Sequence, residues 1–448
     1  MNIPRTEPKT MTNRFLYTVL SITSLAFGCT AANQQAPATE APAAEAAPAE
    51  AAPADEGAAA LPADDEAWTL IEAAAGLHDD SLDWKALWRA VRALEGPPTP
   101  EQQANWKRDE AALAKIDAAL ARPGLSIPVP ESATAALPDW IVYQFIVRAM
   151  CLRGWDKATA GDLTAGAQDM VAAAQLGERF QDTNTYLLPT MVGIAIEGIA
   201  ILELDRLFET IARDDRDAHL AAAQAFQGFS TPSQAVQRAW TAECTSIEAL
   251  LRDLGTDPAK ALGGGELPFT SPGSAEDFAG SYDADATVAW HQAYCDAMAT
   301  AMAEPYVSRT APAPEALWPA KEQADNPFGR QIMQEIYDSS PIGYLEREER
   351  LQAQQGGHAL TWAARAYVLD NDGKLPATAE ALVPDYLSQL PDDPFADGPI
   401  KLDGDRVSSA ANGIENLAGT KTPAELEWVV FTPDSTETTE GSTDGGND

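Results

Sequence analysis

Few residues in this chain have the type and the surroundings that chemistry needs. Glu197 is the only acid embedded in the most apolar stretch, residues 186–204, and burial would raise its pKa and suit it to acid–base chemistry. A bond to a helix-end donor, or to an arginine such as Arg148 or Arg206, would instead make it structural. The sequence contains no Gly-x-Ser-x-Gly, His-Glu-x-x-His, P-loop or Gly-x-Gly-x-x-Gly motif. It therefore assigns no catalytic residue, leaves enzymatic activity open and favours a non-enzymatic role.

The four cysteines suggest different fates. Cys244 and Cys295 lie in two helix-like stretches joined by a glycine-rich loop, so antiparallel packing could bring them together as a disulfide. Cys151 has apolar neighbours that are typical of a buried thiol. The chain has no Cys-x-x-Cys motif and its four histidines are scattered, so we predict no metal site and no cofactor. Whether Cys244 and Cys295 pair is left open by the sequence.

The remaining cysteine, Cys29, follows a basic segment and an apolar run of about 13 residues, 15–27, which is shorter than a membrane span. This arrangement resembles a bacterial lipoprotein signal, although Leu25 stands four places before the cysteine rather than three. The resemblance implies that residues 1–28 are removed and that Cys29 carries a lipid. Thr30 in place of an aspartate implies the outer membrane, with the protein facing the periplasm or the surface.

The composition of the segments at the two ends predicts that they do not fold. Residues 29–64 are nearly all Ala, Pro, Glu and Gln, which predicts an extended, disordered tether that reaches on the order of 100 Å. Residues 434–448 are mostly Ser, Thr, Gly, Asp and Glu, which predicts a disordered acidic tail.

The formal net charge is −38. Such a charge repels nucleic acid and anionic lipid, and it favours solubility in the envelope. The expected partners are therefore the membrane, through the lipid alone, and an envelope protein.

The region 65–369 has the spacing of helices, with apolar residues three and four apart. The apolar stretch 186–204 fits the central helix of a bundle, where Gly193 and Gly198 would let a neighbour approach. We expect irregular paired helices rather than a true repeat array. The remaining helices are expected to pass through Trp68 and Ile71, then to cover 84–94, 100–121, 138–153 (closed by Gly154), a stretch after the cap Asp162, 284–303, 329–336 and 342–369, the last loosened at Gly356-Gly357.

After residue 369 the sequence changes character. The strings Asn371-Asp372-Gly373, Val383-Pro384-Asp385-Tyr386-Leu387 and Leu390-Pro391-Asp392-Asp393-Pro394-Phe395 resemble the C-terminal half of the major pseudopilin of type II secretion, over about residues 360–402. The chain lacks the N-terminal helix that builds pilin fibres, so filament assembly is not implied. The resemblance implies a small α+β segment over 370–433, with a strand over 426–431. It also suggests that Asp393, Asp397, Asp403 and Asp405 could bind calcium. The alternative is an ordinary solvated acidic turn.

Most of the mature chain is also similar to uncharacterised lipid-anchored helical envelope proteins of planctomycetes and myxobacteria. The similarity is carried by Val192–Ile196 and by the turn Asn326–Arg330, which precede the same C-terminal piece. It implies no known activity.

The sequence thus predicts a mainly α fold: an irregular bundle of paired helices with a small α+β C-terminal cap. The function it favours is a lipid-anchored scaffold or protein-binding module of the envelope. An enzyme or factor that acts on envelope polymers, with Glu197 at its site, and an accessory of a secretion system are the alternatives.

Overall fold

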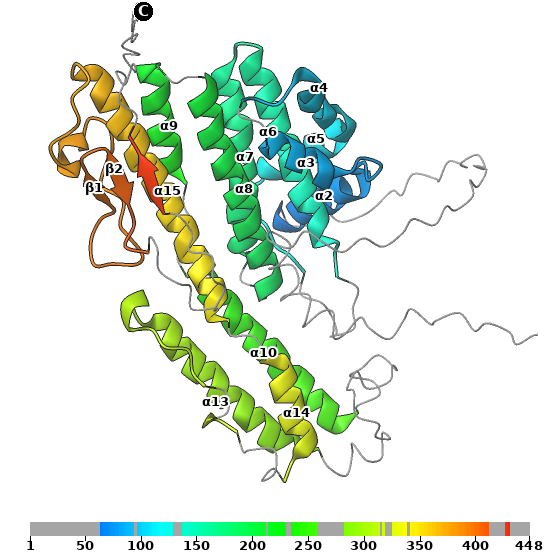
Figure 1. Cartoon of the computed structure of the whole chain (residues 1–448). Helices are drawn as coiled ribbons and strands as arrows, with labels where there is room; N and C mark the ends of the chain where they lie inside the picture. Colours follow the sequence, from blue (N-terminus) through cyan, green and yellow to red (C-terminus); the bar gives the residue numbers. More distant parts are fainter. Residues whose placement is uncertain are drawn as a thin grey trace, which may run out of the picture.

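A computed structural model describes residues 63–93, 96–128, 137–183, 185–211, 214–229, 234–257, 282–313, 316–318, 325–337, 341–411 and 426–430. Over these residues the chain is mainly α-helical, with a small antiparallel sheet near the C-terminus, which confirms the predicted fold class (Figure 1). The signal, the tether up to residue 62, the whole glycine-rich loop 263–281 and the tail 434–448 lie outside the described residues.

The first helices are α2 (Ala63–Leu77) and α3 (Trp84–Arg92), and α3 begins where the carboxylate of Asp83 accepts a bond from the Ala86 N–H. The prediction of one continuous helix over residues 100–121 is wrong. The chain instead forms α4 (Pro100–Gln103), a 3-10 segment η1 (Ala104–Asp109) and α5 (Glu110–Leu120). The 3-10 segment ends at Asp109, which is fully buried and bonded to the α2–α3 loop.

Three long helices form the centre: α6 (Trp140–Thr159), α7 (Leu163–Gln181) and α8 (Leu187–Ile211). The prediction that Gly154 ends the helix is wrong, because α6 continues to Thr159. Gly154 instead allows α6 to pack closely against α7. A Cβ there would lie 2.6 Å from the carbonyl oxygen of Gly166 on α7. Gly177 and Gly193 bring α7 and α8 together in the same way, whereas Gly198 meets only a Leu351 methyl at 3.8 Å. Of the two glycines expected on α8 to allow a close approach, only Gly193 does so with a neighbouring backbone.

Among the described helices, α8 alone is long and apolar enough to cross a membrane by length and composition. Its most apolar window is 72% buried within the protein. Helices α6 and α7 pack against it, so α8 occupies the place of the central core helix that its sequence predicts.

The second half begins with α9 (Arg216–Gly228) and α10 (Ala235–Thr256), and continues with α13 (Ala284–Ala303), the 3-10 turn η2 (Tyr306–Ser308), α14 (Pro327–Ile336) and α15 (Ile342–Asp370). Helix α15 lies beside α9 over its C-terminal part and meets the beginning of α10 near its own N-terminus, and α13, α14 and most of α10 extend beyond that end (Figure 1). It is not broken at Gly356-Gly357, where a loosening was expected. These glycines leave room for Pro391 and for the Trp428 ring.

The C-terminal cap contains the 3-10 turn η5 (Ala379–Leu382) and the strands β1 (Lys401–Asp403), β2 (Arg406–Ser408) and β3 (Glu427–Val429), paired antiparallel in that order. Val407 is opposite Trp428 in the register. The guanidinium of Arg365 on α15 donates to the carbonyl of Val429 at 3.0 Å. The cap therefore packs on α15 and is part of the same body.

Candidate functional site

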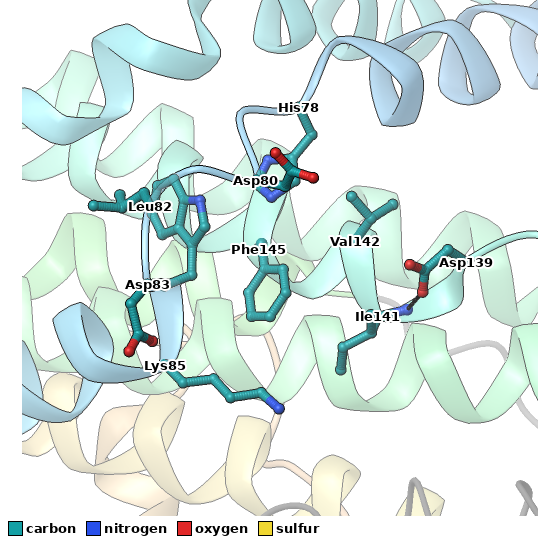
Figure 2. Close-up of a pocket in the computed structure, with 10 residues that line it drawn as sticks. His78, Asp80, Leu82, Asp83, Lys85, Asp139, Ile141, Val142 and Phe145 are labelled. Atoms are coloured by element: carbon teal, nitrogen blue, oxygen red, sulfur yellow. Dashed lines mark hydrogen bonds between the residues drawn. The ribbon is translucent and has the colours of Figure 1, made fainter. Parts of the chain in front are cut away.

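A pocket of about 220 Å³ lies between the α2–α3 loop and the start of α6 (Figure 2). The loop and the first turn of α3 supply most of the polar lining residues, and the start of α6 supplies Asp139 and most of the apolar ones. The ten lining residues are His78, Asp80, Leu82, Asp83, Trp84, Lys85, Asp139, Ile141, Val142 and Phe145. A pocket of this size is smaller than the cavities that hold drug-sized ligands, about 300–1,000 Å³.

The histidine of this pocket is held by a buried carboxylate. Nδ1 of His78 lies 3.0 Å from Oδ1 of Asp109, and the same oxygen accepts the Asp79 N–H at 2.8 Å. The side chains of His78 and Asp109 are only 4% and 0% exposed. The His78 ring also stacks on Phe145, with centroids 5.8 Å apart. Asp109 therefore fixes the orientation of the ring and favours the proton on Nδ1, which leaves Nε2 as an acceptor.

Two of the acids at the pocket also start helices. Asp83 is the N-cap of α3, and Asp139 is the N-cap of α6, where it accepts the Ile141 N–H at 3.3 Å. Both carboxylates are exposed, as are Asp80 and Lys85. The pocket is therefore lined by three acids and one lysine, together with apolar side chains.

Sequence reasoning missed this pocket. His78 and Asp109 are 31 positions apart and lie in different elements, so no local spacing links them. The acids at 83 and 139 carry the usual signal of a helix N-cap, and that signal does not distinguish a binding residue from a purely structural one.

Glu197, the acid singled out from the sequence, is fully buried at the contact of α7, α8 and α15. The amide of Gln181 donates to one of its carboxylate oxygens at 2.5 Å, and the amide of Gln355 donates to the other. Of the arginines weighed as partners, Arg148 donates to the Gln144 carbonyl and Arg206 to the Gly96 carbonyl. With 0% of its surface exposed and both oxygens bonded, Glu197 links three helices and has no access to a substrate.

The structure joins Cys244 of α10 and Cys295 of α13 by a disulfide, with Cα atoms 6.3 Å apart, and leaves Cys151 as a buried free thiol. His291 lies beside the disulfide. Its Nε2 is 2.8 Å from the Cys244 carbonyl oxygen and its Nδ1 is 2.6 Å from the Tyr337 hydroxyl. Burial lowers the pKa of His291, which favours the neutral ring.

The sulfur and nitrogen atoms of Cys244, His291 and Cys295 lie within 4.8 Å of one another, the closest that the described residues come to a soft-metal donor set. Both sulfurs are used by the disulfide and both ring nitrogens are in contact with other groups. In this oxidised form the set does not fit a metal, because metal binding needs free thiolates.

The acids raised as calcium ligands do not form one cluster around a common point. Asp393 is buried and accepts bonds from the Phe395 N–H, the Ser409 hydroxyl and the Ala410 N–H, so its role is to hold the cap together. Asp397, Asp403 and Asp405 are exposed on the loop and the β1–β2 hairpin. The described geometry favours the solvated acidic turn.

Comparison of the chain with protein-family models, curated proteins and solved structures found no match. The family resemblances drawn from the sequence therefore stay predictions. Cys29, the predicted lipidation site, lies outside the described residues.

Proposed function

We propose that this chain is a lipid-anchored protein of the bacterial cell envelope that acts as a non-enzymatic scaffold or protein-binding module. A lipid on Cys29 would hold it at the outer membrane, and the segment 29–64 would let the helical body reach on the order of 100 Å from the anchor. The body would then meet a partner at a distance from its own membrane.

The observation that carries the binding role is the pocket at the α2–α3 loop. It is small, it is lined by both charged and apolar side chains, and its ten lining residues include no serine, threonine or cysteine that could act as a nucleophile. It has room for one side chain of a partner rather than for a polymer chain or a large cofactor.

The disulfide supports the envelope location. Disulfides persist in oxidising compartments such as the periplasm and are rare in the cytosol. The Cys244–Cys295 bond links α10 to α13, the pair that flanks the N-terminal half of α15. A chain exported by the predicted signal would meet the conditions that this bond needs.

The enzymatic alternative receives no support from Glu197. A general acid must reach the group to which it gives a proton, within hydrogen-bond distance or through one water molecule. Glu197 is sealed among three helices and bonded to two glutamine amides. A role as a secretion accessory rests on the sequence resemblance of the cap alone.

The proposed function is tested in the native envelope. The first measurement compares membrane fractions of the wild type with those of Cys29→Ser, and release of the variant into the soluble fraction is expected. The second is chemical cross-linking of the anchored wild type, followed by identification of the products. If Cys29→Ser stays membrane-bound, the anchor is wrong, and if no protein is cross-linked, the binding role is wrong.

A further inference from the structure

We propose that the pocket between the α2–α3 loop and α6 receives a single cationic side chain, lysine or arginine, from the partner protein. This inference rests on the proposed protein-binding role and names the chemistry of the contact. It is argued from the hydrogen-bonding state of His78, the charges around the pocket and the shape of its walls.

The first step concerns the free nitrogen of His78. Asp109 holds the Nδ1 side of the ring, and Nε2 bonds with none of the described residues although the side chain is only 4% exposed. Nε2 itself keeps contact with solvent, since it is not one of the fully buried polar atoms without a partner, and a ligand that bonds it exchanges that contact for a direct hydrogen bond. With the proton on Nδ1, Nε2 is an acceptor, and it calls for a donor such as an ammonium or guanidinium group.

The second step concerns charge. Three carboxylates line the pocket, those of Asp80, Asp83 and Asp139. Lys85 is the one lysine or arginine among the ten lining residues. Carboxylates are acceptors, as is Nε2 in the tautomer with the proton on Nδ1, and a cation with several N–H groups matches them. The net charge of −38 on the whole chain adds a field that draws a basic partner and repels an acidic one.

The third step concerns the walls. Leu82, Ile141, Val142 and Phe145 line the pocket and can bury the methylene stem of a long cationic side chain. Leu77, the residue before His78, is 48% exposed and is one of the two large apolar side chains most exposed in the described residues. It can contact an apolar neighbour of the inserted cation. The acids would repel an anionic ligand, and the volume is too small for a large planar one.

The test uses the four histidines as reporters. The full-length chain with Cys29→Ser is labelled with ¹³C and ¹⁵N in histidine only, which gives four ring signals, and His78→Gln assigns the signal of His78. The probes are capped peptides Ala-Ala-Lys-Ala-Ala and Ala-Ala-Arg-Ala-Ala, with norleucine or glutamate at the centre as controls. Saturable movement of the His78 signal is expected with lysine and arginine alone, while the signals of His219, His291 and His358 stay in place.

A matched pair of variants tests the charges. Asp83→Asn with Asp139→Asn removes two charges and keeps both N-caps, because asparagine caps as well as aspartate. Asp162→Asn with Asp215→Asn makes the same change at the N-caps of α7 and α9, which supply no residue to this pocket. The first pair is expected to raise the Kd of the lysine peptide at least about threefold, and the second to leave it unchanged.

Two results would overturn the inference: an equal response to the norleucine peptide, or no response of His78 to any peptide. Both leave the envelope cross-linking result untouched, so the pocket can fail while the proposed binding function stands. Failure of cross-linking together with a positive peptide titration would reject the function and keep the site.

Discussion

Nδ1 of His78 lies 3.0 Å from the buried carboxylate of Asp109, across 31 positions of sequence. The contact joins the loop after α2 to the end of the 3-10 segment before α5. The helix expected over 100–121 is interrupted by this 3-10 segment, which ends at Asp109. His78 also lines the pocket, so the contact links the 3-10 segment to the candidate binding site.

Asp109→Asn is expected to destabilise the fold. Asparagine keeps the shape but replaces a charge-assisted acceptor in a fully buried position, at a cost of about 1–3 kcal/mol. Urea unfolding measures the change. The control is Asp117→Asn, at an acid whose side chain is 48% exposed and bonded to Arg153, where a loss below about 1 kcal/mol is expected. Equal losses at the two sites would contradict the anchoring role of Asp109.

Gly193→Ala tests the packing of the central helices. The new Cβ would lie 2.5 Å from the Gly177 carbonyl oxygen, so α7 and α8 must move apart, at a cost of about 1–3 kcal/mol or more. Gly198→Ala, on the same helix, meets only a methyl group at 3.8 Å and is expected to gain up to about 1 kcal/mol from helix propensity. Thermal unfolding compares the two. Similar melting temperatures for both variants would show that the close approach is not needed.

Removal of the disulfide is expected to lower the free energy of unfolding. The bond closes a loop with a sequence separation of 51, for which the chain-entropy model gives roughly 4 kcal/mol as an upper value. The double variant Cys244→Ala/Cys295→Ala and the wild type under a thiol reductant should both unfold at lower urea concentrations. Unchanged unfolding of the wild type after complete reduction would mean that the bond contributes nothing.

Glu348 gives a pH dependence whose sign can be stated. It accepts the N–H groups of Ala235 and Val236 at the start of α10, and burial raises its pKa from 4.5 to about 7. A raised carboxyl pKa contributes stability that is fully present below pH 4.5 and is lost as the pH rises through about 7. The loss is on the order of 3 kcal/mol at most.

The measurement is the urea midpoint of unfolding between pH 5 and pH 8.5. The midpoint should fall across this window in the wild type, and Glu348→Gln should flatten the fall. Glu72→Gln, an exposed site on α2, controls for the loss of one negative charge and should keep the wild-type slope. A slope that survives in Glu348→Gln would assign the pH dependence to other groups.

Local patterns predicted the helical class and much of the helix content, because the apolar spacing around Trp84 and Trp88 and the apolar run of α8 specify helix and burial on their own. They misjudged Gly154 and Gly356-Gly357, where glycine serves close packing between distant segments rather than ending or loosening a helix. Glu197 was correctly singled out as an acid in an apolar helix, but its glutamine partners come from α7 and α15, which the sequence could not bring together. The pocket of His78 depends on such long-range contacts throughout.

The central claim, that the chain binds a protein partner through the pocket of His78, is tested most directly by photo-cross-linking in the native envelope. Benzoylphenylalanine replaces Leu77, which is 48% exposed and directly precedes the lining residue His78 in the chain. We predict a discrete product that is kept in Asp162→Asn/Asp215→Asn and reduced at least about threefold in Asp83→Asn/Asp139→Asn. Absence of any product, or equal yield in both double variants, would contradict the claim.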